Sequence, residues 1–160
     1  MPPFTIRPTE PGDRPRVIAM LTGAFAGPEQ VVRGQRYQPQ DLPGFIAEWD
    51  GEAVGMIAYL QNAHDCEIMA LVSLEENQGI GSALLEAVEE TARSAGCRRL
   101  RVVTTNDNLR ALRLYQKRGY HLAALRVNAT DEARKLKPAI PLLGNDGIPL
   151  RDELELRKDL

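Results

Sequence analysis

Hydrophobic and polar positions along the chain change between the period of a helix and the period of a strand. Apolar side chains at intervals of three and four predict helices at residues 17–25, 83–95 and 109–118. Short apolar or β-branched runs predict strands at residues 4–7, 45–49, 53–60, 68–72, 99–105, 120–125 and 153–157. This order predicts an α/β (α+β) fold: a single domain over residues 1–160, with a mixed central sheet of about six to seven strands and helices on both faces.

Turn-forming residues separate these predicted elements. Asp50-Gly51 predicts a tight hairpin between two apolar runs, and Gly96 and Gly119 are expected to end the second and third helices. The second helix is expected to bury its leucine and valine positions and to turn its glutamates, Glu89 among them, to water. Residues 31–43 have no regular period and are expected to form a loop.

Composition is that of an ordinary soluble protein and narrows the function classes. The 160 residues are 43% hydrophobic and 26% charged, with a net charge of −2 and a pI near 5.8. These values argue against a general nucleic-acid or membrane-surface role. No apolar run approaches the ~20 residues of a membrane span, and no signal peptide is evident. Two cysteines make no disulfide framework, so the expected location is the cytoplasm.

The stretch between residues 66 and 85 is the most informative part of the chain. A strand-like run leads through a polar turn into Gln78-Gly79-Ile80-Gly81-Ser82, which opens the second helix. A glycine turn at a helix N-terminus presents free backbone N–H groups and suits a phosphate. A dinucleotide fold is disfavoured because several strands come first and Leu84 occupies the third small position. A Walker A loop is excluded because no lysine precedes Ser82.

A second motif lies downstream, at residues 108–120. It reads Asn108-Leu-Arg-Ala-Leu-Arg-Leu-Tyr115-Gln-Lys-Arg-Gly-Tyr120. With the glycine turn, in this order and on these elements, it resembles the GNAT superfamily of acyl-CoA-dependent N-acyltransferases. The resemblance extends over roughly residues 4–127 and is specific over residues 67–120.

The resemblance implies an activity. The chain is expected to move an acetyl group from acetyl-CoA, as co-substrate, to a primary amine by direct attack through a tetrahedral intermediate. A different class stays open: a non-catalytic acyl-CoA-binding or sensing module with the same GNAT-like fold. The acceptor is expected to be a small-molecule or peptide amine, with no nucleic acid or membrane as partner.

The resemblance also implies the residues of the site. Tyr115 is expected to be the general acid, and its spacing of seven from Asn108 places both on one helix face. The strand at Met69, Ala70 and Leu71 is expected to bind the pantetheine arm and to polarise the thioester carbonyl. The cofactor-binding residues are expected to be Met69, Ala70, Leu71, Asn77, Gln78, Gly79, Ile80, Gly81, Ser82, Asn108 and Tyr115.

The general base is less defined. Glu67 is the candidate, because some relatives keep a carboxylate on this strand, but a solvated carboxylate at a strand end is an equal alternative. His64 and His121 are the other candidate bases, but each stands alone in the sequence. No second ligand group with zinc spacing accompanies the histidines and cysteines, so no metal is expected. Glu76 departs from the Gln or Arg usual in the family, and we expect it to face solvent.

Three features bear on partners. Residues 93–118 hold eight basic side chains against one acidic, and Arg113 or Lys117 could meet the 3′-phosphate of the nucleotide. In the 31–43 loop, Arg33, Arg36 and Tyr37 could read an acidic acceptor. The segment from residue 137 to 160 could complete the sheet or form a homodimer.

Overall fold

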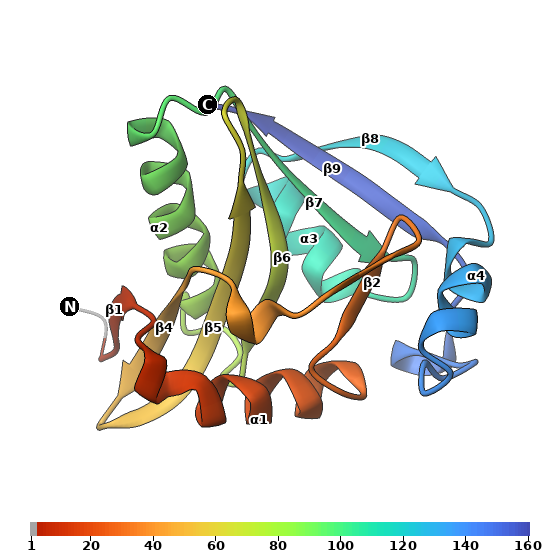
Figure 1. Ribbon diagram of the computed structural model, residues 1–160, viewed down its shortest axis with the longest axis horizontal. Coiled ribbons are helices and arrows are strands. Elements are labelled where there is room, and N and C mark those ends of the chain that lie inside the picture. The colour runs from red at the N-terminus through yellow and green to blue at the C-terminus, as the bar shows by residue number, and fades with distance from the viewer. Residues whose placement is uncertain (1–2) are drawn as a thin grey trace.

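A seven-stranded mixed sheet forms the centre of the structure, a computed structural model that describes residues 3–160 (Figure 1). In spatial order the strands are β1 (Thr5–Pro8), β4 (Gly44–Trp49), β5 (Glu52–Gln61), β6 (Asp65–Ser73), β7 (Arg99–Thr105), β9 (Glu153–Asp159) and β8 (His121–Arg126). Neighbours are antiparallel except β6 and β7, which are parallel. The sequence-based expectation of a mixed sheet of six to seven strands is confirmed, and the last strand completes the sheet.

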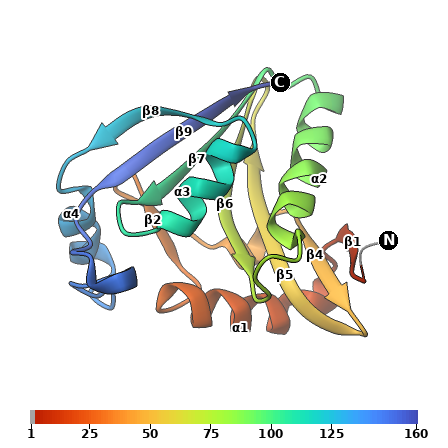
Figure 2. The ribbon, with the colours of Figure 1, turned by 180° about the vertical axis from the view of Figure 1, so that it is seen from behind.

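Helices cover both faces of the sheet, as expected. They are α1 (Arg14–Phe25), α2 (Ile80–Ser94), α3 (Leu109–Lys117) and α4 (Ala129–Leu136), with short 3₁₀ turns η1 (Pro11–Asp13), η2 (Pro39–Asp41) and η3 (Asn145–Gly147). Helix α1 crosses one face, here called the front (Figure 1), whereas α2 and α3 cover the back (Figure 2). Among residues 3–160, no helix is long and apolar enough to cross a membrane.

Strand alternation builds a core on each side of the sheet. Ile46 and Met56 point to the front and pack in one cluster with Leu21 of α1. Their chain neighbours on β4 and β5 point to the back, where Ile57 packs in a second cluster with Leu84 of α2. Successive side chains on a strand face opposite ways, so one apolar strand can serve both layers.

The hairpin at Asp50-Gly51 forms as predicted, but two elements were not predicted. Residues 30–37 form a small second hairpin, β2 (Gln30–Val32) and β3 (Gln35–Tyr37), where a loop was expected. Its tip, Arg33-Gly34, has positive φ at both residues (51° and 77°), as in a type I′ turn. Helix α4 is the other element that was not predicted. It buries only Thr130 and Ala133, so few apolar side chains indicate it in the sequence.

The expectation that Glu89 faces water is wrong. Its side chain on α2 is buried, with a residue exposure of 4%. The Tyr120 hydroxyl donates to Glu89 Oε1 (3.0 Å), and Lys158 Nζ lies 3.1 Å from Oε2. Burial of this carboxylate is tolerated because residues distant in sequence supply both partners.

Candidate active site

Strands β6 and β7 separate part-way along their length. Their parallel pairing runs only from Asp65 opposite Arg99 to Ile68 opposite Val102, although β6 continues to Ser73. A register shift in the β5–β6 pairing leaves Met69 as an extra residue on β6 at this point. Such a bulge bends and twists a strand locally. The separation therefore opens the β7-facing backbone edge at residues 69–71, the stretch that the sequence singled out.

The glycine turn delivers an uncapped helix end to the same region. Asn77 and Gly79 both have positive φ (57° and 80°), and Gly79 is the N-cap residue of α2 without a side-chain cap. A Cβ at Gly79 would meet no atom within 4 Å, so the turn is open on its outer side. The first-turn N–H groups of Ile80, Gly81 and Ser82 therefore face outward, which is an arrangement that binds anions.

Helix α3 lies directly against this turn. A Cβ placed on Gly81 would come within 3.0 Å of Leu114 Cδ2, so the glycine allows α2 and α3 to approach closely. Asn108 begins α3: its side-chain oxygen accepts from the Ala111 N–H at 3.2 Å. The two sequence motifs, 30 residues apart, are thus in contact, and α3 presents Tyr115 one residue beyond Leu114.

Tyr115 is buried, and its hydroxyl makes no hydrogen bond within the described residues. The residue is 4% exposed and packs in the core behind the sheet. Within residues 3–160 no group hydrogen-bonds the hydroxyl, although its oxygen is not completely enclosed. Burial raises the pKa of this phenol, because the anion would lose solvation. Tyr115 therefore stays protonated at neutral and mildly alkaline pH.

Glu67 lies on β6, two residues before the bulge, and is held by arginines. Arg33 at the tip of the β2–β3 hairpin donates Nη1 to Oε2 and Nη2 to Oε1, each at 2.6 Å. Arg101 of β7, directly across in register, approaches Oε1 at 3.4 Å. With a residue exposure of 6%, Glu67 is not a solvated carboxylate at a strand end, and that alternative is wrong.

A model of the Acetyltransferase (GNAT) family matches residues 16–120, which include both motifs. The chain belongs to the GNAT acetyltransferase family. It is 44% identical over 98% of its length, and 99% of the relative, to the uncharacterized protein YxbD of Bacillus subtilis. An IAA acetyltransferase from Bacillus cereus shares the fold at 22% identity, with a TM-score of 0.77 over 98% of this chain and 99% of that one. A GNAT acetyltransferase from Elizabethkingia anophelis, solved with acetyl-CoA bound, has a TM-score of 0.74 at 21% identity and full coverage of both chains.

Within this GNAT fold, Glu76 turns away from the glycine turn. Its carboxylate pairs with Arg110 at 3.2 Å, and both side chains are more than half exposed. The expectation that Glu76 faces solvent is confirmed. Asn77 and Gln78 are exposed beside it, and Ser82 is half-buried in the first turn of α2.

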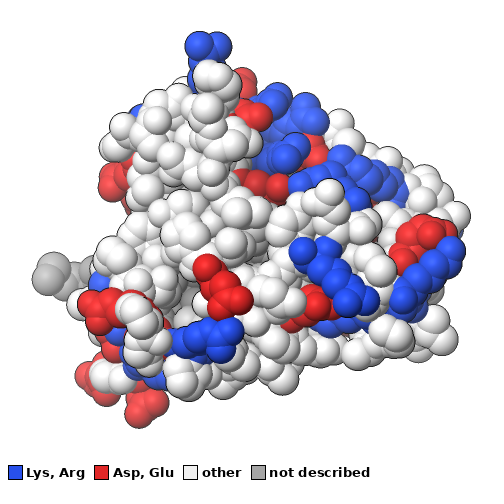
Figure 3. Space-filling view, in the orientation of Figure 1, with Lys and Arg blue, Asp and Glu red and all other residues white. Residues whose placement is uncertain are grey.

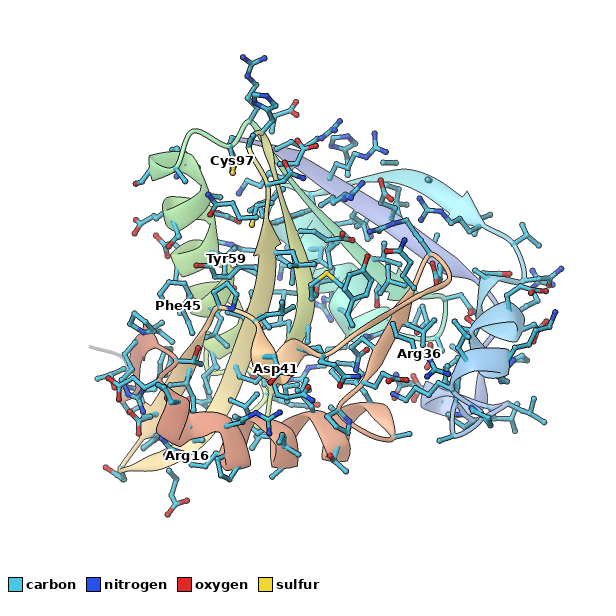
Figure 4. The ribbon with its side chains drawn as sticks, in the orientation of Figure 1. Arg16, Arg36, Asp41, Phe45, Tyr59 and Cys97 are labelled. Atoms are coloured by element: carbon cyan, nitrogen blue, oxygen red, sulfur yellow. The ribbon has the colours of Figure 1, made fainter. Side chains whose placement is uncertain are left out.

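The β2–β3 hairpin stands in front of the separating strands. Arg36 points from β3 toward α4 and donates Nη2 to the Leu136 carbonyl at 2.9 Å (Figure 4). Lys137 Nζ in turn donates to the Phe25 carbonyl at 2.8 Å, which ties the end of α4 to the end of α1. Arg33 and Arg36 thus hold the hairpin in place, and the expectation that they read an acidic acceptor together with Tyr37 stays a prediction.

A pocket of about 230 Å³ lies between the hairpin and the sheet. Its lining residues are Arg33, Tyr37, Leu60, Gln61, Asn62, Asp65, Cys66, Glu67 and Arg101. A second pocket, of about 290 Å³, lies between the start of α1 and η2 and includes none of the predicted site residues. The sequence did not single out Arg101, although its register opposite Glu67 on an alternating strand would have revealed it once the sheet order was known.

Proposed function

We propose that this protein is an N-acetyltransferase that moves the acetyl group of acetyl-CoA to a primary amine. One observation carries the proposal: the hydroxyl of Tyr115, which is not completely enclosed, lies on a helix that contacts an uncapped, glycine-lined helix N-terminus, beside a pair of strands that separate. The bound acetyl-CoA in the Elizabethkingia anophelis structure of the same fold supports the choice of co-substrate.

The residues fit such a co-substrate. Backbone N–H groups at Ile80, Gly81 and Ser82 would hold the pyrophosphate, and the edge at residues 69–71 would hold the pantetheine amides. The nearest carboxylate in the turn, Glu76, is neutralised by Arg110 and does not oppose a phosphate. Asn77, Gln78 and Asn108 complete the binding region, with Asn108 also fixing the start of α3.

Acetyl-CoA would supply an activated acetyl group as a thioester. A backbone N–H of the separated β6 edge at residues 69–71 would stabilise negative charge on the acetyl oxygen. Tyr115 would give its phenolic proton to the departing sulfur, and Glu67 would take the proton of the attacking amine through water. A new C–N bond replaces the C–S bond, and the enzyme returns to its starting state when Glu67 releases the proton that it took and the phenol of Tyr115 regains one from solvent.

The experiment measures thiol release from acetyl-CoA over a panel of amines, together with calorimetric binding of acetyl-CoA. A thiol reagent is compatible with this enzyme, because burial raises the pKa of Cys66 to about 12 and also raises that of Cys97. Turnover with any amine supports the proposal. Binding of acetyl-CoA without turnover on the whole panel would instead establish the non-catalytic acyl-CoA-binding module.

A further inference from the structure

Arginines gather on the front of the C-terminal half of the sheet. They form what we call the front arginine face: Arg33, Arg99, Arg101, Arg126 and Arg157. Arg101 and Arg157 are directly paired on β7 and β9, and Arg99 lies two residues from Arg101 on the same side. Figure 3 shows these cations over β7 and β9 beside the hairpin. The face is a local concentration of positive charge on a chain whose net charge is −2.

Four of these arginines donate hydrogen bonds to carboxylates, whereas Arg101 makes an ion pair but no hydrogen bond. Arg33 makes two bonds of 2.6 Å to Glu67, and Arg157 donates to Glu155 at 2.7 Å. Arg126 donates to Glu155 at 2.8 Å, and Arg99 to Asp65 at 3.3 Å. Arg101 has only the 3.4 Å approach to Glu67.

Arg101 also carries an unpaired donor. Its Nε is enclosed and has no hydrogen-bond partner among residues 3–160, although its side chain is 31% exposed. Nη1 of Arg126 is enclosed and unpaired in the same way, but the two terminal nitrogens of Arg101 also make no hydrogen bond within these residues and are not completely enclosed, so they can meet a group in the pocket. Arg101 lines the 230 Å³ pocket, so the group would arrive there. Asp65 and Glu67 also line the pocket, but Arg99 pairs with the first and Arg33 with the second, so the free donors of Arg101 are left for a hydrogen-bond acceptor with negative charge.

The pocket is placed to serve the reaction. Glu67 forms part of its wall, and Met69, where the strands separate, lies two residues further along β6. Two residues of extended strand cover about 7 Å. If the anionic group of a substrate binds near Arg101, its reacting amine would therefore lie about 7 Å from that group. A short carbon chain spans this distance.

We infer that the acceptor is a small amine with a carboxylate or phosphate group, and that Arg101 recognises this anionic group in the pocket beneath the β2–β3 hairpin. The inference rests on the proposed function and names its substrate class. Arg33 supports the same pocket but is committed to Glu67, so Arg101 is the specificity-determining residue. A planar guanidinium with free donors suits an anionic oxygen pair.

The test compares ω-amino carboxylates of four to six carbons with n-alkylamines of the same length. A second arm compares 3-aminopropyl phosphate with n-propylamine and so distinguishes phosphate from carboxylate. We expect kcat/KM to be at least tenfold higher for the anionic member of one pair, mainly through KM. Equal kcat/KM for the anionic and neutral members of every pair would overturn the inference.

Variants separate recognition from folding. Arg101→Gln should lower the ratio of kcat/KM for the anionic amine to kcat/KM for the neutral amine about tenfold, and Arg101→Lys should restore part of this ratio. Arg99→Gln is the matched control, since Arg99 lies on the same strand face but does not line the pocket; it should leave the preference unchanged. An equal loss on both amines in Arg101→Gln would show a structural role and contradict the inference.

A binding measurement keeps this inference separate from the proposed function. Calorimetry in the presence of CoA would compare 6-acetamidohexanoate with N-hexylacetamide, neither of which requires turnover. Tighter binding of the carboxylate, lost in Arg101→Gln, supports the pocket even if no amine is acetylated. Equal binding of the two amides, with turnover of neutral amines, would leave the acetyltransferase intact and refute the anionic acceptor.

Discussion

The rings of Tyr115 and Tyr120 pack with centroids 5.7 Å apart, yet their hydroxyls have opposite environments. The Tyr120 hydroxyl donates to the buried Glu89, whose other oxygen binds Lys158. The Tyr115 hydroxyl has no partner among residues 3–160, and its oxygen is not completely enclosed. Two neighbouring phenols of similar burial thus divide into one that stabilises the fold and one that is free to react.

This division predicts different losses for two conservative variants. Tyr115→Phe should lower kcat about 100-fold, because the proton for the departing thiolate is lost, and should change stability little. Tyr120→Phe should lower the free energy of unfolding by about 1–3 kcal/mol, because Glu89 loses a buried hydrogen bond, and should keep kcat within a few-fold. Steady-state kinetics and urea unfolding of both variants check this.

Each variant is the control for the other, since both remove one oxygen from the same aromatic pair. Unchanged turnover in Tyr115→Phe would show that another group protonates the sulfur. Burial raises the pKa of both phenols, so neither should ionise in the neutral range, and the pH profile of kcat should carry no tyrosine step there.

Glu76 predicts a salt-dependent effect on co-substrate binding. Removing its charge in Glu76→Gln frees Arg110 at the start of α3, so acetyl-CoA should bind two- to fivefold more tightly at low ionic strength. The difference should disappear near 1 M salt, where exposed charges are screened within ~3 Å. Calorimetric titrations at two salt concentrations measure it, and an effect independent of salt would argue against an electrostatic cause.

Gly79 and Gly23 both have open surroundings, but we expect an alanine at each position to change stability in opposite directions. A Cβ would meet nothing within 4 Å at Gly79 or at Gly23. Gly79 has φ of 80°, so Gly79→Ala should destabilise the fold by about 1–2 kcal/mol through backbone strain. Gly23 lies within α1, so Gly23→Ala should stabilise by about 0.5–1 kcal/mol. Thermal unfolding distinguishes them, and equal shifts would show that φ is not the cause.

Asp13 is expected to account for part of the loss of folding stability at low pH. Hydrogen bonds from Arg7 and Arg16 hold the pKa of this buried carboxyl well below its usual range. A carboxyl with a lowered folded-state pKa contributes stability above its unfolded pKa of about 3.9 and loses it as pH falls further. Asp13→Asn should therefore be less stable than the parent at pH 7, and the difference should shrink below about pH 4. Urea midpoints at pH 7 and pH 3 test this, and a constant difference would contradict it.

Sequence periodicity was sufficient for most of the sheet and three helices, because each carries its own apolar signal. The Asp50-Gly51 hairpin followed from turn chemistry that both residues obey, with φ of 52° and 80°. The β2–β3 hairpin could not be predicted in this way, because its strands have three residues each and its tip is Arg-Gly, an uncommon pair for that turn.

The parts of the site that lie in short sequence motifs could be predicted. The contacts between residues far apart in the sequence could not. The glycine turn and residues 108–120 lie in two short segments, so their proximity could be expected from the family resemblance. The bonds from Arg33 to Glu67 span 34 residues, and those between Glu89 and Lys158 span 69. Nothing in either local segment indicates such a partner, so these bonds appeared only in three dimensions.

The position of β9 between β7 and β8 has a consequence for the order of folding. β7 and β8 are close in sequence but do not pair with each other: β8 pairs with residues 153–159, and the same residues form the second partner of β7, beside β6. The C-terminal part of the sheet therefore cannot grow by local zippering and must close a long loop first. The helix that carries Tyr115 lies within that loop, and Leu156 of β9 belongs to the same core as Tyr115, so the packing around the reactive phenol is complete only when the last strand is in place.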